Sequence, residues 1–428
     1  MTNNYSDIVL RTLFVDFNAY FASVEQQLRP ELRGLPVGVV PVMAETSSCI
    51  AASYEAKRFG IKTGTGVREA RRLCPDIAIV QARPELYVQM HERAVALIDT
   101  IAPVRQVVSI DEMECELTGR WQCEERAVDL AKRIKHAVSS ELGTCMRVSV
   151  GIAPNTLLGK LASDMQKPDG LVVIRPDQIP SAFAHLSASA INGVGPRMAR
   201  RLAAVGIDTV QALFDAPRSL LHAVWGGVAG DEMYDKIRGA YYEPRKVDTK
   251  SLGHSHVLPP DLRSANDAYS VLTRLTQKAA MRLRKQGFFA TSMSVHLRCI
   301  KRANEDIRTG YGTDARFWQT QDTAFFLHTL ASLWQQVMQS EVLQHHKPLS
   351  VGMVFAGLVP AANHTPSLFD TSTQNARDPK HTQLLQTLDR VNKQYGKNTL
   401  YYAASHGALD RAPMRIAFTR IPDVETEG

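Results

Sequence analysis

The stretch VVSIDEMECEL (Val107–Leu117) has the pattern of a β-strand, yet two adjacent carboxylates, Asp111 and Glu112, lie at its centre. Successive residues of a regular strand point to opposite faces of a sheet. The two acids can therefore act on one target only if the chain turns there, as it does at the tip of a hairpin. A solvated turn without a function is the alternative, and an isolated Asp-Glu pair does not decide between the two.

A third carboxylate comes from the segment RTLFVDFNAYFASVEQQL (Arg11–Leu28). Its first residues alternate as in a strand, so that Thr12, Phe14 and Asp16 share a face, and helical spacing begins near Phe21. Asp16 therefore lies where a strand ends and a helix begins. If this strand neighbours the hairpin, three carboxylates converge, and such a cluster needs a cation such as Mg²⁺. The alternative is that Asp16 only caps the helix.

Three further residues have the chemistry of a phosphate site. In SYEAKRFG (Ser53–Gly60), Tyr54 and Lys57 are three residues apart and share one helix face. A lysine acts as a point charge and a tyrosine as a directed donor, and both suit a triphosphate. Lys160 adds a second cation near the start of a predicted helix, close to its positive end. Solvated side chains on helix surfaces are the alternative for each residue taken alone.

The segment INGVGPRMARRLAAVGI (Ile191–Ile207) predicts a helix-hairpin-helix. The turn at Gly193 and Gly195 leaves backbone N–H groups that can bind a phosphate, and Arg197 and Arg200 follow on the next helix. Such turns hold a nucleic-acid backbone without reading its sequence. A simple αα-hairpin is the alternative.

The charge of the chain is uneven. The 428 residues carry a formal net charge of +7, and the pI is about 9.0. From Lys236 to Arg302 there are fourteen Lys or Arg and four Asp or Glu, which is a net charge of +10. This surplus fits a groove that follows a nucleic-acid backbone, although a solvated helix face explains part of it.

The composition is that of a globular, intracellular protein. The six cysteines form no C-x-x-C pair, which favours a reducing compartment. The polar start MTNNYSD does not resemble a signal peptide, and no apolar run reaches the ~18 residues of a membrane span. We therefore expect a cytoplasmic location and no membrane partner. After about residue 178 the pattern changes to short helices.

Five segments resemble, in the same order, motifs of the Y-family of lesion-bypass DNA polymerases. They are VDFNAYFASVEQ, YEAKRFGIKTG, SIDEMECELTG, SVGIAPNTLLGKLASDMQKPDG and INGVGP. Within the family, DFNAYFAS and the tail LLQTLDRVNKQYGKNTLYYA (Leu384–Ala403) resemble bacterial UmuC, the catalytic subunit of polymerase V. YEAKRFG is closer to DinB, or polymerase IV. We therefore expect a UmuC-like member with DinB-like features, and a DinB-like polymerase IV is the alternative.

The resemblance implies an α+β, multidomain fold. This is a right-handed polymerase with a ferredoxin-like palm, small fingers, a helical helix-hairpin-helix thumb and an α+β little finger. The implied limits are 1–28 and 83–178 for the palm, 29–82 for the fingers, 179–243 for the thumb, 244–253 for a linker and 254–358 for the little finger. Residues 359–428 would form a C-terminal tail with a UmuC-like helix and strand.

By position, the resemblance also implies the catalytic metal site. Asp16, Asp111 and Glu112 match the metal-binding carboxylates, and the backbone carbonyl of Phe17 matches a further ligand. Two Mg²⁺ ions are the implied cofactors. Met113 stands where the family usually has a small residue, so we expect altered packing beside the site and intact metal binding.

The remaining implied roles concern the substrates. Tyr54, Lys57 and Lys160 match the triphosphate-binding residues. Phe21 matches the steric gate, a ring that leaves no room for the 2′-hydroxyl of a ribonucleotide. Contacts with primer–template DNA are implied for the hairpin and the linker, at Gly193, Gly195, Arg197, Arg200 and Lys250.

The implied activity is template-directed, error-prone translesion DNA synthesis in DNA repair and SOS mutagenesis, in a bacterial cytoplasm. The segment Thr365–Phe369 keeps Leu368 and Phe369 of the family's clamp-binding peptide but lacks its glutamine, so we expect a weakened contact with a sliding clamp. A UmuC-like chain would also work with a UmuD′-like dimer and RecA.

Two competing functions come from other classes. A catalytically inactive, ImuB-like DNA-binding accessory would lack the three acids that this chain keeps. A palm-fold nucleotidyl cyclase would share the acids but would have no use for the hairpin or the basic segment.

Overall fold

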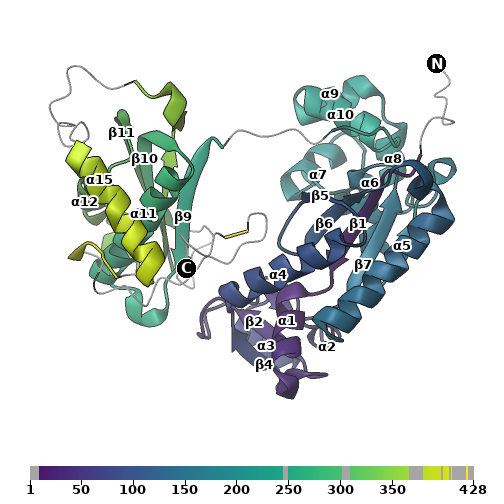
Figure 1. Cartoon of the computed structure of the whole chain (residues 1–428), viewed down its shortest axis with the longest axis horizontal. Coiled ribbons are helices and arrows are strands. Elements are labelled where there is room, and N and C mark those ends of the chain that lie inside the picture. Colours follow the sequence, from purple (N-terminus) through teal and green to yellow (C-terminus); the bar gives the residue numbers. More distant parts are fainter. Residues whose placement is uncertain are drawn as a thin grey trace.

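The computed structural model describes residues 9–243, 249–300, 309–365, 379–396, 399–403, 406 and 421–422. Figure 1 shows two bodies, one formed by the chain up to residue 243 and one that begins after residue 249. No helix in this described part of the chain is long and apolar enough to cross a membrane.

The first body is organised around a five-stranded sheet in the order β5-β6-β1-β7-β8. Its strands are β1 (Thr12–Phe17), β5 (Val104–Val107), β6 (Glu112–Glu116), β7 (Val148–Ala153) and β8 (Leu171–Val173). Neighbouring strands are antiparallel except β7 and β8, which are parallel. With helices α4 (Pro84–Asp99) and α5 (Glu124–Ala137), the element order β1-α4-β5-β6-α5-β7 is ferredoxin-like.

The two faces of the central strand β1 have different neighbours. Leu13 and Val15 belong to the main apolar core, which also contains residues of α4 and α5. Asp16 lies on the opposite face, under helix α6 (Thr156–Met165). A Cβ atom at Gly151 of β7 would lie 2.0 Å from the carbonyl oxygen of Gly159 in α6, so this approach requires glycine. The close packing holds α6 directly over the face that carries Asp16.

A smaller, three-stranded sheet with the order β3-β2-β4 lies beside helix α1 (Tyr20–Leu28). Its strands and the helices that follow them are β2 (Val37–Val40), β3 (Ala51–Ala52), α2 (Tyr54–Lys57), α3 (Val67–Leu73) and β4 (Ala78–Gln81). The hydroxyl of Ser53 accepts a hydrogen bond from the Ala56 amide at 3.3 Å and so caps α2. This cap fixes the short helix that carries Tyr54 and Lys57.

Four short helices complete the first body and share an apolar core with α6. They are α7 (Pro196–Ala203), α8 (Val210–Asp215), α9 (Arg218–Trp225) and α10 (Val228–Lys236). The expected hairpin turn precedes α7, and Gly193 there has a φ of +94°. The element before the turn is a single 3₁₀ turn, η6 (Ala188–Ala190), which the Ser187 hydroxyl caps by accepting the Ser189 amide. The hairpin thus has a shortened first helix.

Further short helical turns in the described part of the chain connect longer elements. They are η2 (Pro30–Leu32), η3 (Gly119–Gln122), η4 (Val138–Leu142), η5 (Pro176–Gln178), η7 (Pro260–Leu262) and η8 (Ala361–Asn363).

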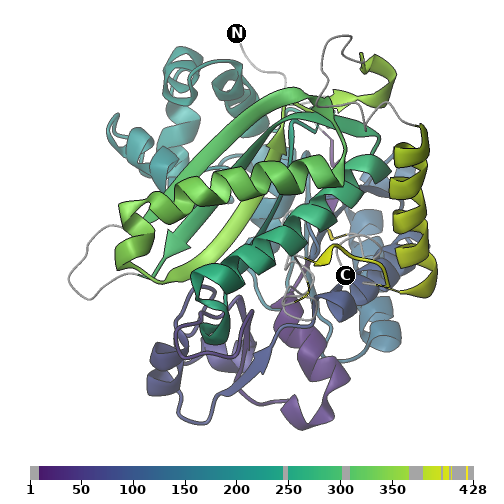
Figure 2. The same ribbon diagram turned by 90° about the vertical axis from the view of Figure 1, so that its left-hand side faces the viewer.

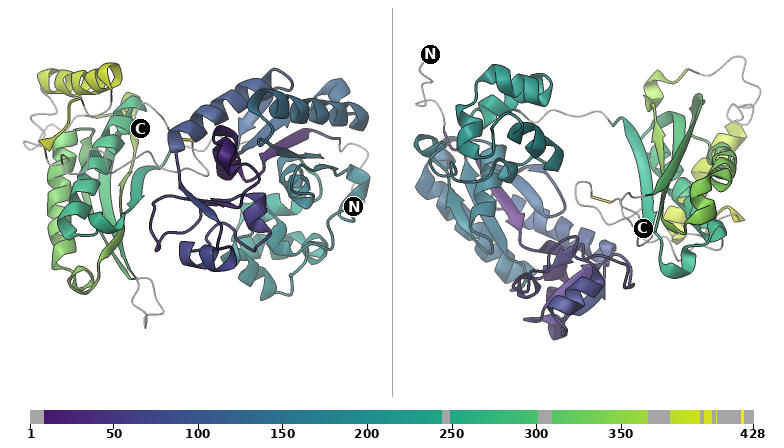
Figure 3. Two further views of the ribbon diagram at one scale, coloured as in Figure 1. Left: turned by 90° about the horizontal axis from the view of Figure 1, so that it is seen from below. Right: turned by 180° about the vertical axis from the view of Figure 1, so that it is seen from behind.

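The second body contains a four-stranded antiparallel sheet with the order β11-β10-β12-β9. Its strands are β9 (Ser251–Val257), β10 (Phe288–Cys299), β11 (Gly310–Thr320) and β12 (Pro348–Ala356). Helices α11 (Ala265–Lys285) and α12 (Thr323–Gln339) cover one face of this sheet, and α13 (Glu341–His345) follows them (Figure 2). The other face is turned toward the first body (Figure 3).

The helix expected in the C-terminal tail is present as α15 (Pro379–Tyr395). Arg284, near the end of α11, forms a bidentate ion pair with Asp389, with N–O distances of 2.7 and 2.8 Å. This pair ties α15 to the second body. Residues 399–403 form no strand. The expected clamp-binding residues Leu368 and Phe369 lie outside the described residues.

One expected domain limit falls inside an observed strand, and another falls directly before one. β9 begins at Ser251, so the expected linker 244–253 includes the first three residues of a strand. A short strand, β13 (Val359–Pro360), pairs with Phe288–Phe289 of β10, so the sheet region continues past the expected limit at 358. Both elements depend on their pairing partners, which a local sequence pattern does not show. The other limits stay proposals.

Candidate active site

The three acids meet at one edge of the five-stranded sheet. β1 and β6 pair with Asp16 opposite Glu112. Asp111 lies in the turn of the β5–β6 hairpin, and its carbonyl oxygen accepts the Phe17 amide at 2.8 Å. The expected hairpin tip is therefore confirmed, and the turn brings Asp111 close enough to Asp16 for their charges to interact.

Two side chains hold this turn, and the sequence did not single out either of them. His91 of α4 is 3% exposed, and its Nδ1 lies 2.7 Å from the carbonyl oxygen of Ile110, so Nδ1–H is the donor. Burial lowers the pKa of His91, although the bond to Ile110 opposes this, so the ring is neutral at pH 7. The Ser109 hydroxyl donates to Asp111 Oδ1 at 2.6 Å. Both contacts fix the position of Asp111.

A lysine from α6 lies between the acids. The Lys160 ammonium group forms an ion pair with Asp16 and another with Glu112, the latter at 2.7 Å. It also lies 3.3 Å from Asp164, one helical turn further along α6. Burial lowers the pKa of Lys160, but the charges of Asp16, Glu112 and Asp164 outweigh burial and raise the net pKa. Lys160 is therefore a charged ammonium group at the centre of the site.

A second lysine reaches the same carboxylate. Lys167 Nζ lies 2.7 Å from the free oxygen of Asp16 and 2.7 Å from Asp164. The sequence analysis quoted Asp164 and Lys167 within the segment SVGIAPNTLLGKLASDMQKPDG but gave neither residue a role. The local pattern does not show that the loop after α6 returns to Asp16.

The electrostatics of Asp111 differ from those of an exposed acid. Burial is the main cause that raises its pKa, to about 6, and the negative charges of Asp16 and Glu112 raise it as well. The Ser109 hydroxyl and the Lys160 ammonium oppose this shift. The site thus has an excess of negative charge that two lysines only partly offset, and it favours a further cation.

The donor set suits a hard divalent cation. Asp16, Asp111 and Glu112 offer carboxylate oxygens, which Mg²⁺ prefers, and Phe17 ends β1 beside them. The Lys160 ammonium already occupies a cation position between Asp16 and Glu112. In the described part of the chain, no group of three or more acidic, histidine or cysteine side chains is arranged so that it could hold a metal ion. A cation that used both Asp16 and Glu112 would have to displace the Lys160 ammonium group.

The expected triphosphate residues lie next to this cluster. Lys57 Nζ is 4.2 Å from the centroid of the Tyr54 ring. Burial and the nearby charges of Asp16 and Asp164 raise the pKa of Tyr54 to about 12. Burial and the charge of Lys167 lower the pKa of Lys57, whereas Asp16 raises it. These interactions place α2 beside the acids, so the structure brings the predicted phosphate ligands and carboxylates together.

Phe21 of α1 is 4% exposed and has a rigid support. Its ring stacks on Tyr87, with centroids 4.7 Å apart and an angle of 26° between the planes. The Tyr87 hydroxyl donates to the buried Glu25 at 2.8 Å, and Arg83 holds Glu25 with two hydrogen bonds of 3.0 and 2.6 Å. The sequence analysis missed this support. Glu25 lies one turn after Phe21 in α1, whereas Tyr87 and Arg83 lie in α4 and at its start, far from Phe21 along the chain.

The expected DNA contacts lie on the surface. Gly193, Gly195, Arg197 and Arg200 are exposed around the start of α7, and Lys250 is exposed just before β9. Within the described residues, none of the five forms a hydrogen bond or ion pair with the three acids. The structure therefore places these residues apart from the acidic cluster.

The open face of the second sheet was not expected from the sequence. Its residues from β9, β10 and β12 are mostly small, and these include Ser255, Ser292, Ser294 and Gly352. Arg298 of β10 and Arg316 of β11 are exposed on the same face, together with Asp314 and Trp318. A flat surface of small residues with basic side chains at its edge suits contact with a polyanionic backbone.

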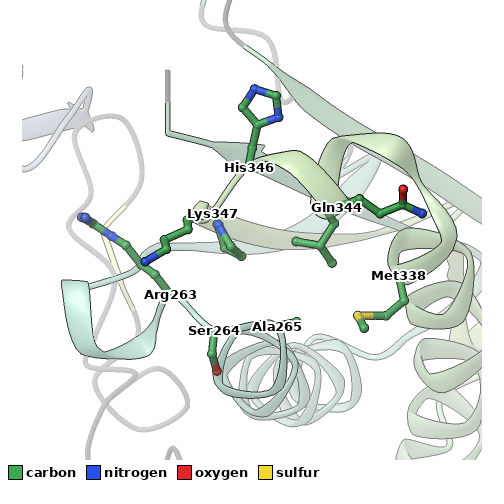
Figure 4. Close-up of a pocket in the computed structure, with 9 residues that line it drawn as sticks. Arg263, Ser264, Ala265, Met338, Gln344, His346 and Lys347 are labelled. Atoms are coloured by element: carbon green, nitrogen blue, oxygen red, sulfur yellow. The ribbon is translucent and has the colours of Figure 1, made fainter. Parts of the chain in front are cut away.

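A cavity of about 360 Å³ lies in the second body, at the start of α11. Figure 4 shows Arg263, Ser264 and Ala265 on one side of it, with Met338 and Gln344 on the other. None of the residues that line the cavity belongs to the acidic cluster. We therefore do not place the reaction there.

Known proteins resemble the chain over both bodies. The model of the impB/mucB/samB family matches residues 15–164, and the model of the C-terminal domain of that family matches residues 249–368. DNA polymerase IV of Moorella thermoacetica is 33% identical over 92% of this chain and 95% of its own length. A solved Y-family DNA polymerase chimera of Dbh and Dpo4 covers 82% of this chain and 99% of its own, with 24% identity and a TM-score of 0.67.

This chain belongs to the Y-family of DNA polymerases. The multidomain α+β polymerase fold expected from the sequence is confirmed. The structure of DinB from Sulfolobus solfataricus covers 81% of this Y-family polymerase, with 25% identity and a TM-score of 0.51.

The relatives also bear on the subfamily of this Y-family polymerase. The Moorella protein is named DNA polymerase IV, and so is a Gluconobacter oxydans protein that is 36% identical over 62% of this chain and 74% of its own. These names support the DinB-like alternative better than the UmuC-like expectation. The class of DNA-directed DNA polymerase is confirmed by the same relatives.

Proposed function

We propose that this Y-family polymerase carries out template-directed DNA synthesis as a DinB-like polymerase IV. The observation that supports this most strongly is the convergence of Asp16, Asp111 and Glu112 at one sheet edge, with Lys160 between them. In the proposed reaction the primer 3′-oxygen attacks the α-phosphorus of a deoxynucleoside triphosphate, and pyrophosphate leaves.

Each residue has a proposed part in this reaction. Asp16, Asp111, Glu112 and the Phe17 carbonyl would hold two Mg²⁺ ions. When bound, such a pair of ions activates the attacking oxygen and stabilises the leaving oxygen of a phosphoryl displacement.

The remaining site residues bind and select the nucleotide in this proposal. Tyr54 donates a hydrogen bond to the triphosphate, and Lys57 and Lys160 offset its negative charge. Phe21, held by Tyr87, excludes a ribose 2′-hydroxyl by overlap.

We assign DNA binding to two surfaces. The Gly193–Gly195 turn, followed by Arg197 and Arg200, would hold one backbone through amides and charge. The open face of the second sheet, with Lys250 before it, would follow the duplex without reading its sequence. Both surfaces are exposed.

Translesion synthesis, DNA repair and SOS mutagenesis in a bacterial cytoplasm are the proposed setting. The relatives named polymerase IV are bacterial. A UmuD′-like dimer and RecA were expected only for a UmuC-like chain, and the relatives named polymerase IV do not support these partners. An ImuB-like accessory is disfavoured, because the three acids are present and converge.

The test is primer extension together with DNA binding by the variant Asp111→Asn. We expect extension to be abolished, because Asp111 takes part in the reaction. The dissociation constant for primer–template DNA should stay within about twofold, because Asp111 does not bind the duplex in this proposal. Asp177→Asn, at an exposed acid of η5, is the matched control and should extend normally. Retained extension by Asp111→Asn would overturn the proposal.

We also keep the weakened clamp peptide as a proposal. Replacement of Leu368 and Phe369 by alanine should shorten the products made in the presence of a sliding clamp, because two apolar anchors are lost. Product length without the clamp should not change. If the products made with the clamp are equally long for the variant and the unmodified chain, this peptide does not bind the clamp.

A further inference from the structure

Both oxygens of the central carboxylate are occupied by ammonium groups from this chain. Lys160 pairs with one oxygen of Asp16, and Lys167 lies 2.7 Å from the other. The side chain of Asp16 is only 4% exposed, so water competes little for these contacts. A divalent cation that uses Asp16 must therefore take the place of at least one ammonium group.

The position of Lys167 is fixed by the loop that carries it. The amide of Asp169 donates to Asn18 Oδ1 at 2.7 Å. Lys135 Nζ donates to the carbonyl oxygens of Asp169 and Val148, at 2.8 and 2.9 Å. These bonds tie the loop after α6 to the sheet, so Lys167 is held within reach of Asp16.

A fourth carboxylate is shared by the same two lysines. Asp164 lies 3.3 Å from Lys160 Nζ and 2.7 Å from Lys167 Nζ. Its side chain is 42% exposed, against 4% for Asp16. An ammonium group that moves from Asp16 to Asp164 therefore keeps an anionic partner and gains water. Exposed ion pairs of this kind are weak, so Asp164 does not trap an ammonium group that leaves Asp16.

We propose that metal binding to Asp16 is an exchange with Lys160 and Lys167, and that Asp164 is the positioning residue that receives the two lysines. The exchange keeps their charges beside the site, where Lys160 is the proposed partner of an incoming triphosphate. The inference rests on the proposed function, because it assumes that Asp16 is a metal ligand.

The test is the binding of Mn²⁺ to the full chain without nucleotide or DNA, followed by the electron paramagnetic resonance signal of free Mn²⁺. Mn²⁺ is a probe that prefers the same oxygen ligands as Mg²⁺. Four chains form a double-mutant cycle: the unmodified chain, Asp164→Asn, Lys160→Met with Lys167→Met, and the combination of all three.

We expect the two lysine substitutions to tighten Mn²⁺ binding about tenfold, which corresponds to about 1.4 kcal/mol. Asp164→Asn alone should weaken binding severalfold, because the lysines lose their alternative partner and stay on Asp16. In the background without the lysines, Asp164→Asn should have almost no effect. Lys236→Met and Asp215→Asn are matched controls outside the site and should leave the affinity unchanged.

Two results would overturn the proposal. If the lysine substitutions do not tighten Mn²⁺ binding, the lysines do not compete with the metal for Asp16. If Asp164→Asn has an equal effect in both backgrounds, Asp164 acts on the metal directly by its charge and not through the lysines. If the methionine pair does not fold, glutamine at both positions removes the same charges. Primer extension by the unmodified chain tests the proposed function separately, so the two failures can be told apart.

Discussion

The sheet that carries Asp16 has helices on both faces, whereas the sheet of the second body has helices on one face only. In the first sheet, acids at the strand ends under α6 form ion pairs with lysines that only partly offset their charge. In the second sheet, the open face carries serine and glycine, with Arg298 and Arg316 exposed.

We infer from this difference that the two sheets have different uses. Burial on both faces lowers the effective dielectric constant. The attraction between the carboxylates at this edge and a cation is therefore stronger than in water. On the exposed face of the second sheet, water and salt screen each single charge. Affinity for a polyanion there depends on the combined effect of several charges. Changes in the first sheet should therefore alter chemistry and selectivity, and changes in the second should alter affinity.

Among changes that keep the three acids, the largest expected effect is on sugar selection in the first body. Phe21→Ala opens the space beside the proposed sugar site, so discrimination against ribonucleotides should fall on the order of a hundredfold. The ratio of kcat/KM for deoxy- and ribonucleotides measures this. DNA affinity should not change, and Phe59→Ala, at an exposed ring of the same body, is the control. An unchanged sugar preference would contradict the assignment of the gate.

The next effect is on DNA affinity in the second body. Replacing Arg298 and Arg316 by alanine should weaken primer–template binding about tenfold and reduce the slope of log affinity against log salt by about 2. Sugar selection should stay as it is. Arg390→Ala, on the exposed side of α15, is the control. If affinity and its salt dependence are unchanged, the open face is not a DNA surface.

A smaller effect is expected at the buried histidine behind the acids. His91→Leu leaves the Ile110 carbonyl oxygen without its donor, which should lower the free energy of unfolding by about 1–3 kcal/mol. The maximal rate of extension should fall as well, because the turn that carries Asp111 loses a support. His91→Asn keeps a donor and should recover part of both losses. A rate that His91→Leu leaves unchanged, or that His91→Asn does not recover in part, would contradict this role of His91.

The smallest effect concerns pH and the second body. Burial, and then the charge of Lys278, lower the pKa of His256 to about 4, from an ordinary value of 6.5. The unfolded chain therefore binds more protons than the folded chain between these two values, and stability rises with pH across that window. Hydrogen exchange of β9 amides should slow as pH rises from 4 to 6.5, after correction for the intrinsic pH dependence of exchange. His256→Gln should flatten the corrected profile, and an unchanged profile would show that other groups control it.

The positions of the acids at strand ends could be predicted from the sequence, because each is indicated by a pattern of neighbouring residues. Alternation placed Asp16 at the end of a strand, and the adjacent pair Asp111 and Glu112 required a turn. Lys57 and Tyr54 needed only helical spacing. The resemblance to one family then supplied the order of these segments.

The residues that support the site could not be predicted, because their contacts join segments that are far apart in the sequence. His91 touches Ile110 and Tyr87 touches Phe21 only after the helix α4 packs on the sheet. Alternation predicted β10, but which of its faces stays open depends on α11 and α12, which lie elsewhere in the chain. The strands at Ser251 and Val359 were missed for the same reason, since each is defined by its partner.

The central claim is that the acidic edge of the first sheet performs templated nucleotidyl transfer. Its most direct test is single-nucleotide incorporation by the unmodified chain, with Mg²⁺, on four primer–templates that differ only in the templating base. Each template should direct incorporation of its complementary deoxynucleotide. Absence of incorporation, or incorporation that does not depend on the template base, would contradict it.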